Sequence, residues 1–278
     1  MTTDVKDAPP DLPVMHPCSM HSACAYCKGQ PPADAPDWSF LDAIYCISLT
    51  SRDDRVRDVS AEFHRVGLCR HVTFYRPTKN PVKGIIGSWE SHRAVAQHAR
   101  SRGAERALIF EDDVLFVRPV TRASIAAVAR ALDGLPEDWM IFHLGHWPLS
   151  GYFVHANVMR TSSACAHAYI VSPRLLEWLD RHPWGAPDIR KRLFVGKALD
   201  SAYAALPGTY ALFRMMVIQR VSPSDNLGTQ RRRIKKLSHL VTRTRYREVL
   251  LSTLMRPSEI IVAALSPFFW LASKLGRD

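Results

Sequence analysis

The sequence predicts an α/β fold in which a mostly parallel central sheet is flanked by helices. Short apolar runs alternate along the chain with segments in which apolar residues recur at helical spacing. Parallel strands need crossover connections, which are usually helices, so this alternation favours parallel pairing. The 278 residues are 47% hydrophobic and 23% charged, which is enough to bury one good-sized core.

The expected strands are runs of five or six mostly apolar residues bounded by polar segments, a pattern typical of buried strands. They are residues 44–49, 72–76, 107–111, 139–144 and 167–172. Helices are expected over residues 54–68, 88–102, 121–132, 173–181 and about 190–205. Gly87 provides a turn before the second of these helices, and Ser88 is a favourable N-cap residue.

The N-terminal end of the chain differs from this core. Residues 1–37 are rich in Pro, Ala and Asp without periodicity, which predicts a flexible leader containing Cys and His. The first 30 residues lack the continuous apolar segment of a signal peptide, so we expect a cytoplasmic protein. The globular domain is expected over residues 38–229.

Residues 230–278 form a tail that carries most of the formal net charge of +11, because it holds 11 Lys and Arg against 3 acids. Its longest uncharged run, residues 260–273, is 14 residues long, shorter than the roughly 20 needed to span a bilayer. A basic segment followed by Phe268, Phe269 and Trp270 is typical of an amphipathic helix that lies on an anionic membrane. The alternative is a tail that packs on the domain or on a partner.

The stretch "ALIFEDDVLF", residues 107–116, places three acids directly after a buried strand. In an open α/β sheet the ligand crevice lies beyond the carboxyl ends of the strands, where Glu111, Asp112 and Asp113 are expected. Adjacent carboxylates repel one another, and Mg²⁺ or Mn²⁺ would relieve that repulsion through oxygen ligands. In an extended chain Glu111 and Asp113 would share one face and Asp112 the other. The alternative is that these acids only cap the next turn.

Three motifs occur in the same order and spacing as in a known enzyme family. They are "AIYCISLTSRDDR" with Arg52 and Arg55, "GIIGSWESHRAVAQHA" with Gly87, Ser91 and His92, and "ALIFEDDVLF". Together they resemble glycosyltransferase family 25, which includes bacterial lipooligosaccharide galactosyltransferases and collagen galactosyltransferases. The resemblance covers about residues 43–226, with Ser88 in place of the family's Cys.

The resemblance implies a GT-A-like nucleotide-sugar fold and an inverting, metal-assisted transfer of a sugar, galactose or glucose, from a UDP-sugar to an acceptor hydroxyl of a glycan or glycolipid. It implies that Asp113 and Glu111 hold Mn²⁺ or Mg²⁺, and that Glu111 or Asp112 reaches the ribose or a metal-bound water. Inversion needs a base that takes the proton of the acceptor, for which Asp200 and Asp188 are the candidates.

The remaining motif residues are expected around the donor. Arg52 and Arg55 would contact its diphosphate, although arginines just after a strand are also common on surfaces. Gly87, Ser91 and His92 are placed at the donor site by the resemblance. Their alternative is structural: Ser91 caps the helix, and His92 is a packed helical histidine.

A second group of metal-binding residue types lies in the leader segment "HPCSMHSACAYC". It offers His16, Cys18, His21, Cys24 and Cys27, and thiolate and imidazole are the usual ligands of zinc. Zinc sites normally show two ligand pairs separated by a loop, whereas this segment has a single C-x-x-C pair. The sequence therefore does not favour zinc here.

Five further Cys and His residues are interpreted as structural. Cys46, Cys69 and Cys165 lie in expected core elements, where a reduced thiol packs as a small apolar group. His143 and His146 are expected on opposite faces of a strand end, which does not favour a shared metal.

Two other functions fit part of the pattern. In a metal-dependent nuclease or phosphohydrolase the acids would hold the ion and the basic tail would hold nucleic acid, but this leaves the motif at Gly87–His92 unexplained. An inactive membrane-associated scaffold with a transferase fold is the other. If the protein is a transferase, its expected partners are a nucleotide-sugar donor, a glycan or glycolipid acceptor and an anionic membrane surface, and no nucleic acid.

Overall fold

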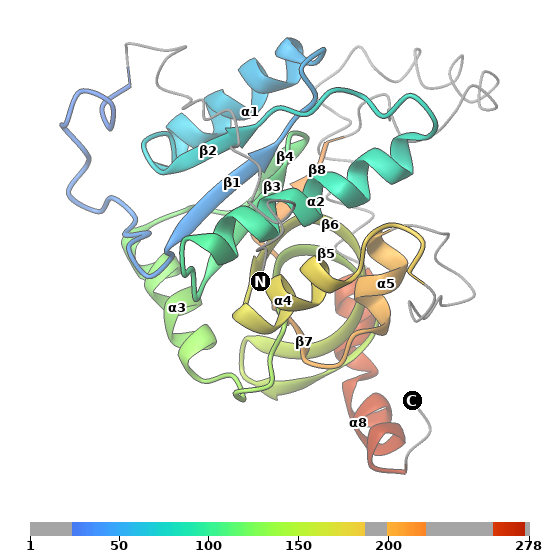
Figure 1. Ribbon diagram of the computed structural model, residues 1–278. Helices are drawn as coiled ribbons and strands as arrows, with labels where there is room; N and C mark the ends of the chain where they lie inside the picture. The colour runs from blue at the N-terminus through green and yellow to red at the C-terminus, as the bar shows by residue number, and fades with distance from the viewer. Residues whose placement is uncertain (1–23, 187–198, 221–257, 276–278) are drawn as a thin grey trace, which may run out of the picture.

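The computed structural model describes residues 24–186, 199–220 and 258–275 (Figure 1). The strands are β1 (Ala43–Ile47), β2 (Val72–Tyr75), β3 (Ala107–Glu111), β4 (Val114–Phe116), β5 (Ile141–His155), β6 (Val158–Val171), β7 (Thr209–Leu212) and β8 (Val217–Gln219). The helices are α1 (Asp53–Arg65), α2 (Gly84–Ser101), α3 (Arg122–Asp133), α4 (Pro173–Arg181), α5 (Leu199–Ala205) and α8 (Ser266–Lys274).

Six strands form the central sheet in the order β2-β1-β3-β6-β5-β7, and β4 pairs with β8 in a separate ribbon. The α/β class is confirmed, but the sheet is mixed rather than mostly parallel. The pairs β1–β2, β1–β3 and β5–β7 are parallel, whereas β6 runs antiparallel to β3, β5 and β7. The parallel half therefore consists of β2, β1 and β3, which are joined through the crossover helices α1 and α2.

The antiparallel half arises from a long hairpin made by β5 and β6. The expected strands 139–144 and 167–172 are only the distal parts of this hairpin, because the residues between them continue both strands. These residues mix polar, small and bulky side chains, so they show no continuous apolar run. A short turn joins β5 to β6, and two strands joined in this way must run antiparallel.

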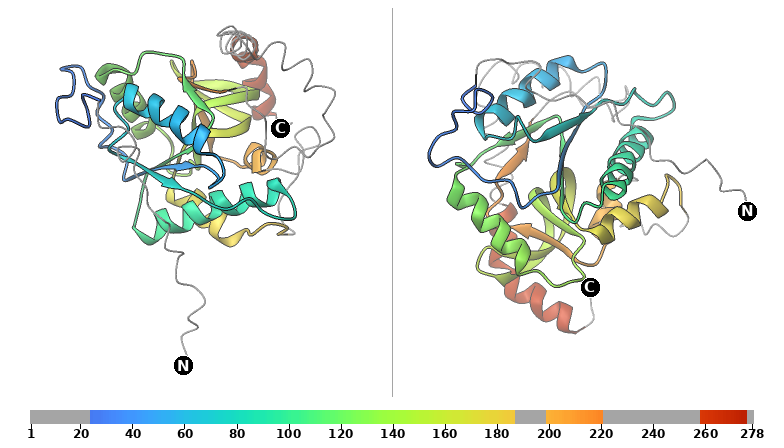
Figure 2. Two further views of the ribbon diagram at one scale, coloured as in Figure 1. Left: turned by 90° about the horizontal axis from the view of Figure 1, so that it is seen from above. Right: turned by 60° about the vertical axis from the view of Figure 1, so that its left-hand side comes forward.

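The sheet lies between two helical layers, α1 with α3 and α2 with α4 (Figure 2). The alternation of side chains along each strand divides the core in the same way. On β3, Leu108 and Phe110 pack with residues of α1 and α3. Ala107 and Ile109 point the other way and pack with residues of α2, α4 and α5.

Most of the expected helices are present, with shifts at their ends. Helix α4 spans residues 173–181 as predicted, and α1 and α3 each shift by one to three residues. Helix α2 begins at Gly84 with Lys83 as its N-cap, so the prediction that Ser88 caps it is wrong. The Asn80 side chain accepts from the N–H groups of Val82 and Lys83 and thereby holds the turn before the helix.

Part of the C-terminal tail packs on the domain. Residues 258–264 are helical, and α8 follows with Pro267 in its first turn, where the missing N–H is tolerated. The buried Glu259 accepts from the N–H of Met215 at 2.7 Å, and the Ser266 hydroxyl accepts from the N–H of Phe153 at 2.8 Å. The basic stretch from residue 230 to residue 257 lies outside the described residues. In the part of the chain that the structure describes, none of the helices combines the length and the apolar character needed to cross a bilayer.

Candidate functional site

The acids lie where the sheet topology predicts a ligand crevice. Because β1 and β3 are parallel neighbours with Ile47 opposite Glu111, both strands end at the same edge. A cavity of about 330 Å³ opens there. Seven of the residues that the motifs single out line it, namely Arg55, Gly87, Ser91, His92, Glu111, Asp112 and Asp113.

Asp112 is fixed by two donors from the first motif. Its Oδ2 accepts from the Ser48 hydroxyl at 2.7 Å, and its Oδ1 accepts from Nη1 of Arg55 at 2.7 Å. Ser48 follows β1 directly, so the register that pairs Ile47 with Glu111 also brings Ser48 to Asp112. The ion pair is largely buried, with side-chain exposures of 13% for Arg55 and 7% for Asp112. Each oxygen of the Asp112 carboxylate therefore already accepts one hydrogen bond.

Asp113 differs from its neighbour. Its Oδ2 accepts from the Gln219 amide at 3.0 Å, and Nη1 of Arg55 lies 3.9 Å away. Its Oδ1 is buried and has no hydrogen-bond partner among the described residues. Burial, followed by the charge of Glu111, raises the pKa of Asp113 to about 8. A buried carboxylate oxygen without a hydrogen-bond partner, on a residue that lines a cavity, is an atom that a cation would satisfy.

Glu111 begins a chain of hydrogen bonds that runs into the core. Its Oε1 lies 3.4 Å from Nε2 of His92, whose Nδ1 lies 2.6 Å from the Tyr169 hydroxyl, which in turn lies 3.1 Å from that of Tyr203. Burial lowers the pKa of His92 to about 4, so a neutral imidazole can donate to Glu111 and accept from Tyr169. Burial, then Asp200 and Asp112, raises the pKa of Glu111 to about 8, an effect moderated by the 26% exposure of its side chain.

All three acids line one cavity, so the prediction that Asp112 points away from Glu111 and Asp113 is wrong. Strand β3 ends at Glu111, and the chain turns at Asp112 and Asp113 before β4 begins. The alternation of an extended chain does not apply within a turn.

Of the two candidate bases, the structure describes only Asp200. It lies in the first turn of α5, and its charge acts on both Glu111 and His92. Burial raises the pKa of Asp200, while the backbone N–H groups of Ala166 and Cys165 oppose this by hydrogen bonding to its carboxylate. Cys165 has a positive φ of 75°, unusual for a residue with a side chain. Asp200 is not among the residues that line the cavity, and Asp188 lies outside the described residues.

The first turns of α2 form one wall of the cavity. A Cβ at Gly87 would lie 2.9 Å from Cβ of Asn80, so glycine allows the preceding loop to pack closely on the helix. The Ser91 hydroxyl donates to the carbonyl of Gly87 at 2.6 Å, which gives it a structural bond within α2 as well as a place in the wall.

Arg52 does not belong to the cavity wall. Its guanidinium pairs with Asp54 at 2.8 Å in the first turn of α1. The expectation that both Arg52 and Arg55 contact a diphosphate is therefore reduced to Arg55. One helical turn separates the two residues, and only the latter faces the sheet edge.

Three further residues of the wall were missed by the sequence analysis: Lys79, Asn80 and Arg220. Lys79 and Asn80 lie in the loop after β2, and Arg220 follows β8. The backbone N–H of Arg220 donates to the carbonyl of Asp113, and its guanidinium lies 3.4 Å from Glu62. Arg220 could have been found from its position directly after a strand. Strand β8, however, has only three residues and is too short to be recognised as an apolar run in the sequence.

The cavity therefore combines three carboxylates with three cationic side chains, those of Arg55, Lys79 and Arg220. Carboxylate oxygens suit Mg²⁺ or Mn²⁺, and arginine and lysine suit phosphate. Asp113 and Glu111 fit the role of ligands because Asp113 has an unpartnered buried oxygen and Glu111 has only one long contact. Asp112 fits less well, since Ser48 and Arg55 already occupy it. Such a site can hold a divalent cation together with a diphosphate.

A second group of buried titratable residues lies on the β5–β6 hairpin. The rings of His143 and His146 lie 5.9 Å apart, so the prediction that they occupy opposite faces is wrong. Register shifts on either side of Gly145 break the alternation between them. Burial lowers the pKa values of both residues and of His167, so these imidazoles are neutral and pack as core groups.

No protein-family model matches the chain, and no curated protein matches its sequence. Among solved structures, the chain is similar to A197 from STIV at 11% identity and a TM-score of 0.39, over 66% of this chain and 86% of that one. It is similar to a glycosyltransferase involved in glycosylation of the major capsid of PBCV-1 at 14% identity and a TM-score of 0.30, over 49% and 63%. UDP-glucose pyrophosphorylase complexed with UDP-glucose matches at 11% identity and a TM-score of 0.35, over 61% and 72%.

These TM-scores are all below 0.5, and the sequence identities are 14% or lower. The neighbours include proteins named as a glycosyltransferase and a UDP-glucose pyrophosphorylase, but none is named as a member of glycosyltransferase family 25. The resemblance to that family stays a prediction.

Proposed function

We propose that the protein is a metal-dependent glycosyltransferase with a GT-A-like fold, which moves a sugar from a UDP-sugar to an acceptor hydroxyl with inversion. The observation that carries the proposal is the cavity at the ends of β1 and β3, in which Asp113 offers an unpartnered buried oxygen beside Glu111 and opposite cationic groups. The sequence resemblance supports the choice of reaction and of donor.

Asp113 and Glu111 would hold Mn²⁺ or Mg²⁺, whose bound charge stabilises the leaving diphosphate. Arg55 and Lys79 would contact the phosphate oxygens, and Arg220 would complete the cationic side. Asp112 holds Arg55 in place, so its contribution to the donor site is through positioning. His92 orients Glu111 and fixes its own tautomer through Tyr169.

Inversion also needs a carboxylate that accepts the acceptor's proton. Asp200 is the candidate that the described residues offer, and burial raises the pKa of its carboxyl group, which makes the carboxylate a stronger base. Asp188 remains the alternative from the sequence. A glycan or glycolipid hydroxyl is the acceptor class that we propose.

Donor hydrolysis tests the proposal without knowledge of the acceptor. We expect the protein to release UDP slowly from one of a panel of UDP-sugars in the presence of Mn²⁺. Asp113→Ala should reduce that release at least about 100-fold, because it removes a group on which charge stabilisation in the transition state depends. Asp133→Ala is a matched control: this exposed aspartate pairs with Arg106, away from the cavity, and its substitution should leave the rate unchanged.

Each other outcome has a definite meaning. Equal rates for wild type and Asp113→Ala would contradict the assignment of the metal ligand. Cleavage of nucleic acid without turnover of any UDP-sugar would replace the transferase by the nuclease alternative. Absence of both activities, with UDP and Mn²⁺ failing to bind in calorimetry, would favour the inactive scaffold.

A further inference from the structure

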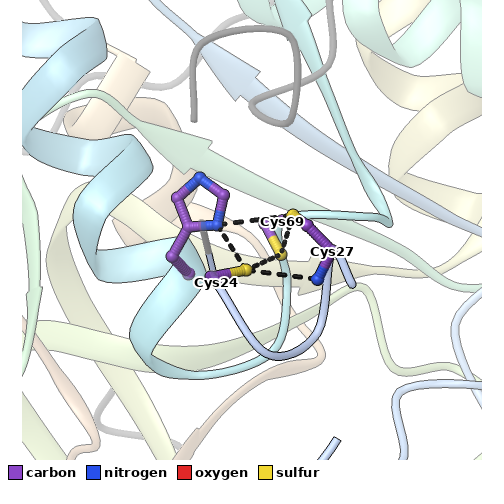
Figure 3. A group of neighbouring side chains, drawn as sticks. Cys24, Cys27 and Cys69 are labelled. Atoms are coloured by element: carbon purple, nitrogen blue, oxygen red, sulfur yellow. Dashed lines mark hydrogen bonds between the residues drawn. The ribbon is translucent and has the colours of Figure 1, made fainter. Parts of the chain in front are cut away.

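Four side chains of metal-binding types meet at the C-terminal end of α1 (Figure 3). None of them lines the carboxylate cavity. Cys24 and Cys27 come from the segment before the first strand, His64 from the last turn of α1, and Cys69 from the loop that leads to β2. Their ligand atoms all lie within 4.8 Å of one another. The three cysteines are thiols that are not joined by disulfide bonds.

Three of the distances between these atoms are close to those of a tetrahedral zinc site. With Zn–S bonds of about 2.3 Å and Zn–N bonds of about 2.0–2.1 Å, neighbouring ligand atoms of a tetrahedron lie about 3.5–3.8 Å apart. Cys69 Sγ lies 3.6 Å from Cys24 Sγ and 3.4 Å from Cys27 Sγ, and Cys27 Sγ lies 3.6 Å from His64 Nδ1. The Cys24 Sγ to His64 Nδ1 distance is shorter, at 2.9 Å.

The first ligand pair lies on a turn that presents both sulfurs to the same point. The backbone N–H of Cys27 donates to Sγ of Cys24 at 3.2 Å, a bond that stabilises negative charge on the sulfur. The N–H of Lys28 donates to the carbonyl of Cys24 at 3.1 Å. Gly29 follows with φ of 74°, a conformation that favours glycine, and reverses the chain.

The second ligand pair is brought close by the end of α1. Gly67, with φ of 71°, turns the chain between His64 and Cys69. A Cβ at Gly67 would lie 2.7 Å from the ring of Tyr26, so glycine also lets the first turn pack directly on the second. Tyr26 lies between Cys24 and Cys27 in the sequence, and all three pack on the main core cluster.

We propose that Cys24, Cys27, His64 and Cys69 bind a structural zinc ion. The set is C-x-x-C followed by H-x₄-C, which gives two ligand pairs from separate segments of the chain. Three thiolates and one imidazole are a common composition of structural zinc sites. The protein supplies all four ligands, so no position is left open for a substrate. Soft thiolates select zinc, whereas the hard oxygens of the carboxylate cavity suit Mn²⁺ or Mg²⁺.

Two predictions from the sequence differ from this proposal. The segment "HPCSMHSACAYC" did not favour zinc because it shows only one pair, but the second pair lies far along the chain. Cys69 is a cluster member as well as a buried thiol. His16, Cys18 and His21 lie outside the described residues.

The proposed zinc would fasten residues 24–30 to α1. These residues fall within the leader that the sequence predicts to be flexible, yet their turns pack against the domain. Metal binding couples this segment to folding, because four ligands distant in the unfolded chain must meet. None of the four residues lines the carboxylate cavity, so the zinc proposal does not depend on the proposed transferase function.

Metal analysis of the full chain, purified without chelators, tests the proposal. We expect about one zinc per chain in wild type and little in Cys27→Ser or His64→Ala, since three ligands hold zinc far more weakly than four. Cys46→Ala and His71→Asn are matched controls. Cys46 is a buried thiol on β1 and His71 a histidine near the cluster, and neither belongs to it, so both variants should retain zinc.

Cobalt substitution keeps the test independent of whether a variant folds. Wild type reconstituted with Co²⁺ should show the intense visible absorption of tetrahedral thiolate-bound cobalt, and Asp113→Ala should show the same spectrum. A chain without zinc that also fails to give this spectrum under reducing conditions would overturn the proposal. So would a disulfide between two of the three cysteines, seen as a mass lower by two hydrogens in the reduced-buffer preparation.

Discussion

Asp112 and Asp113 are adjacent in the chain, but their carboxylates have different partners. Asp112 accepts from Ser48 and Arg55 and so has partners for its negative charge. Asp113 has one amide donor and a buried oxygen without a partner, and its pKa rises to about 8. Asp112 therefore has partners that stabilise the fold, whereas Asp113 has a buried oxygen that the proposed cation would bind.

This contrast predicts opposite effects of the same substitution. The native state keeps a proton on Asp113 up to about pH 8, whereas the unfolded chain loses it near the ordinary aspartate pKa of 3.8. The stability of the metal-free protein therefore falls as pH rises between these values. Asp113→Asn cannot ionise and should raise the free energy of unfolding at pH 8 by about 2 kcal/mol. Asp112→Asn should lower it by about 3 kcal/mol, because it removes the negative charge that pairs with the largely buried Arg55 at 2.7 Å.

Denaturant unfolding of the metal-free proteins at pH 5 and pH 8 measures both effects. The difference between wild type and Asp113→Asn should be small at pH 5 and grow toward pH 8. Addition of Mn²⁺ should stabilise wild type and leave Asp113→Asn unchanged. A destabilised Asp113→Asn at pH 8 would show that the carboxylate is satisfied without a metal.

At the residue scale, the sequence predicted the acids and Arg55 because each stands at a recognisable position after an apolar strand. It also predicted Arg52, and nothing in the chain before folding distinguishes two arginines separated by one helical turn. Arg220 could not be predicted, because its place depends on the pairing of β8 with β4, which is a contact between distant parts of the chain.

At the scale of elements, Gly145 fixes the distance between β5 and β8. A Cβ at this position would lie 2.2 Å from the carbonyl oxygen of Val217 and 2.5 Å from Nε2 of His167. The neighbouring Leu144 carbonyl accepts from the N–H of Met216 at 2.8 Å, so β8 is held directly against β5. Gln219, at the end of β8, reaches Asp113 only because of this approach.

We therefore expect Gly145→Ala to lower the free energy of unfolding by about 3 kcal/mol, since backbone and a buried ring must move to admit the methyl group. The rate of donor hydrolysis should fall as well, because a shift of β8 would also move Gln219, which donates to Asp113. Gly134→Ala is the control: φ is −88° and the nearest atoms to its Cβ lie at 3.6–3.8 Å, so its change should stay within about 0.5 kcal/mol. Urea unfolding of the two variants decides the matter, and equal stabilities would contradict the role given to Gly145.

The same hairpin shows why the sheet could be predicted only in part. Strand β3 was predicted with its correct bounds because its first four residues are apolar and buried and an acid follows them. Strands β5 and β6 extend well past their apolar parts, where hydrogen bonds to each other and to β7 maintain them without a continuous apolar run. The apolar runs in the sequence, taken alone, predict a mostly parallel sheet. The sheet is mixed because the residues between the runs 139–144 and 167–172 form a hairpin.

At the scale of the whole molecule, the C-terminal segment both packs on the domain and presents an apolar surface. Glu259, Val262 and Ser266 are buried, whereas Phe268, Trp270, Leu271 and others are exposed. Helix α8 lies at the end of the molecule away from α1 (Figure 1). Both alternatives for the tail are therefore compatible: its inner face docks, and its outer face is left for an interfacial membrane contact.

We propose that this outer face binds anionic membranes, where a glycolipid acceptor would lie. Deleting the whole tail is a poor test, because it would also remove Glu259, which accepts from the backbone of Met215. The double variant Trp270→Ser, Leu271→Ser should instead weaken binding to phosphatidylserine-containing vesicles about tenfold or more, since each exposed apolar side chain contributes roughly 1.5–3 kcal/mol when buried. Leu149→Ser removes a similarly exposed leucine from β5 and should leave vesicle binding unchanged.

Cosedimentation with vesicles measures the effect. Donor hydrolysis in solution should be equal in wild type and both variants, because these residues lie outside the carboxylate cavity. Retention of full vesicle binding by the double variant would assign the tail to packing alone.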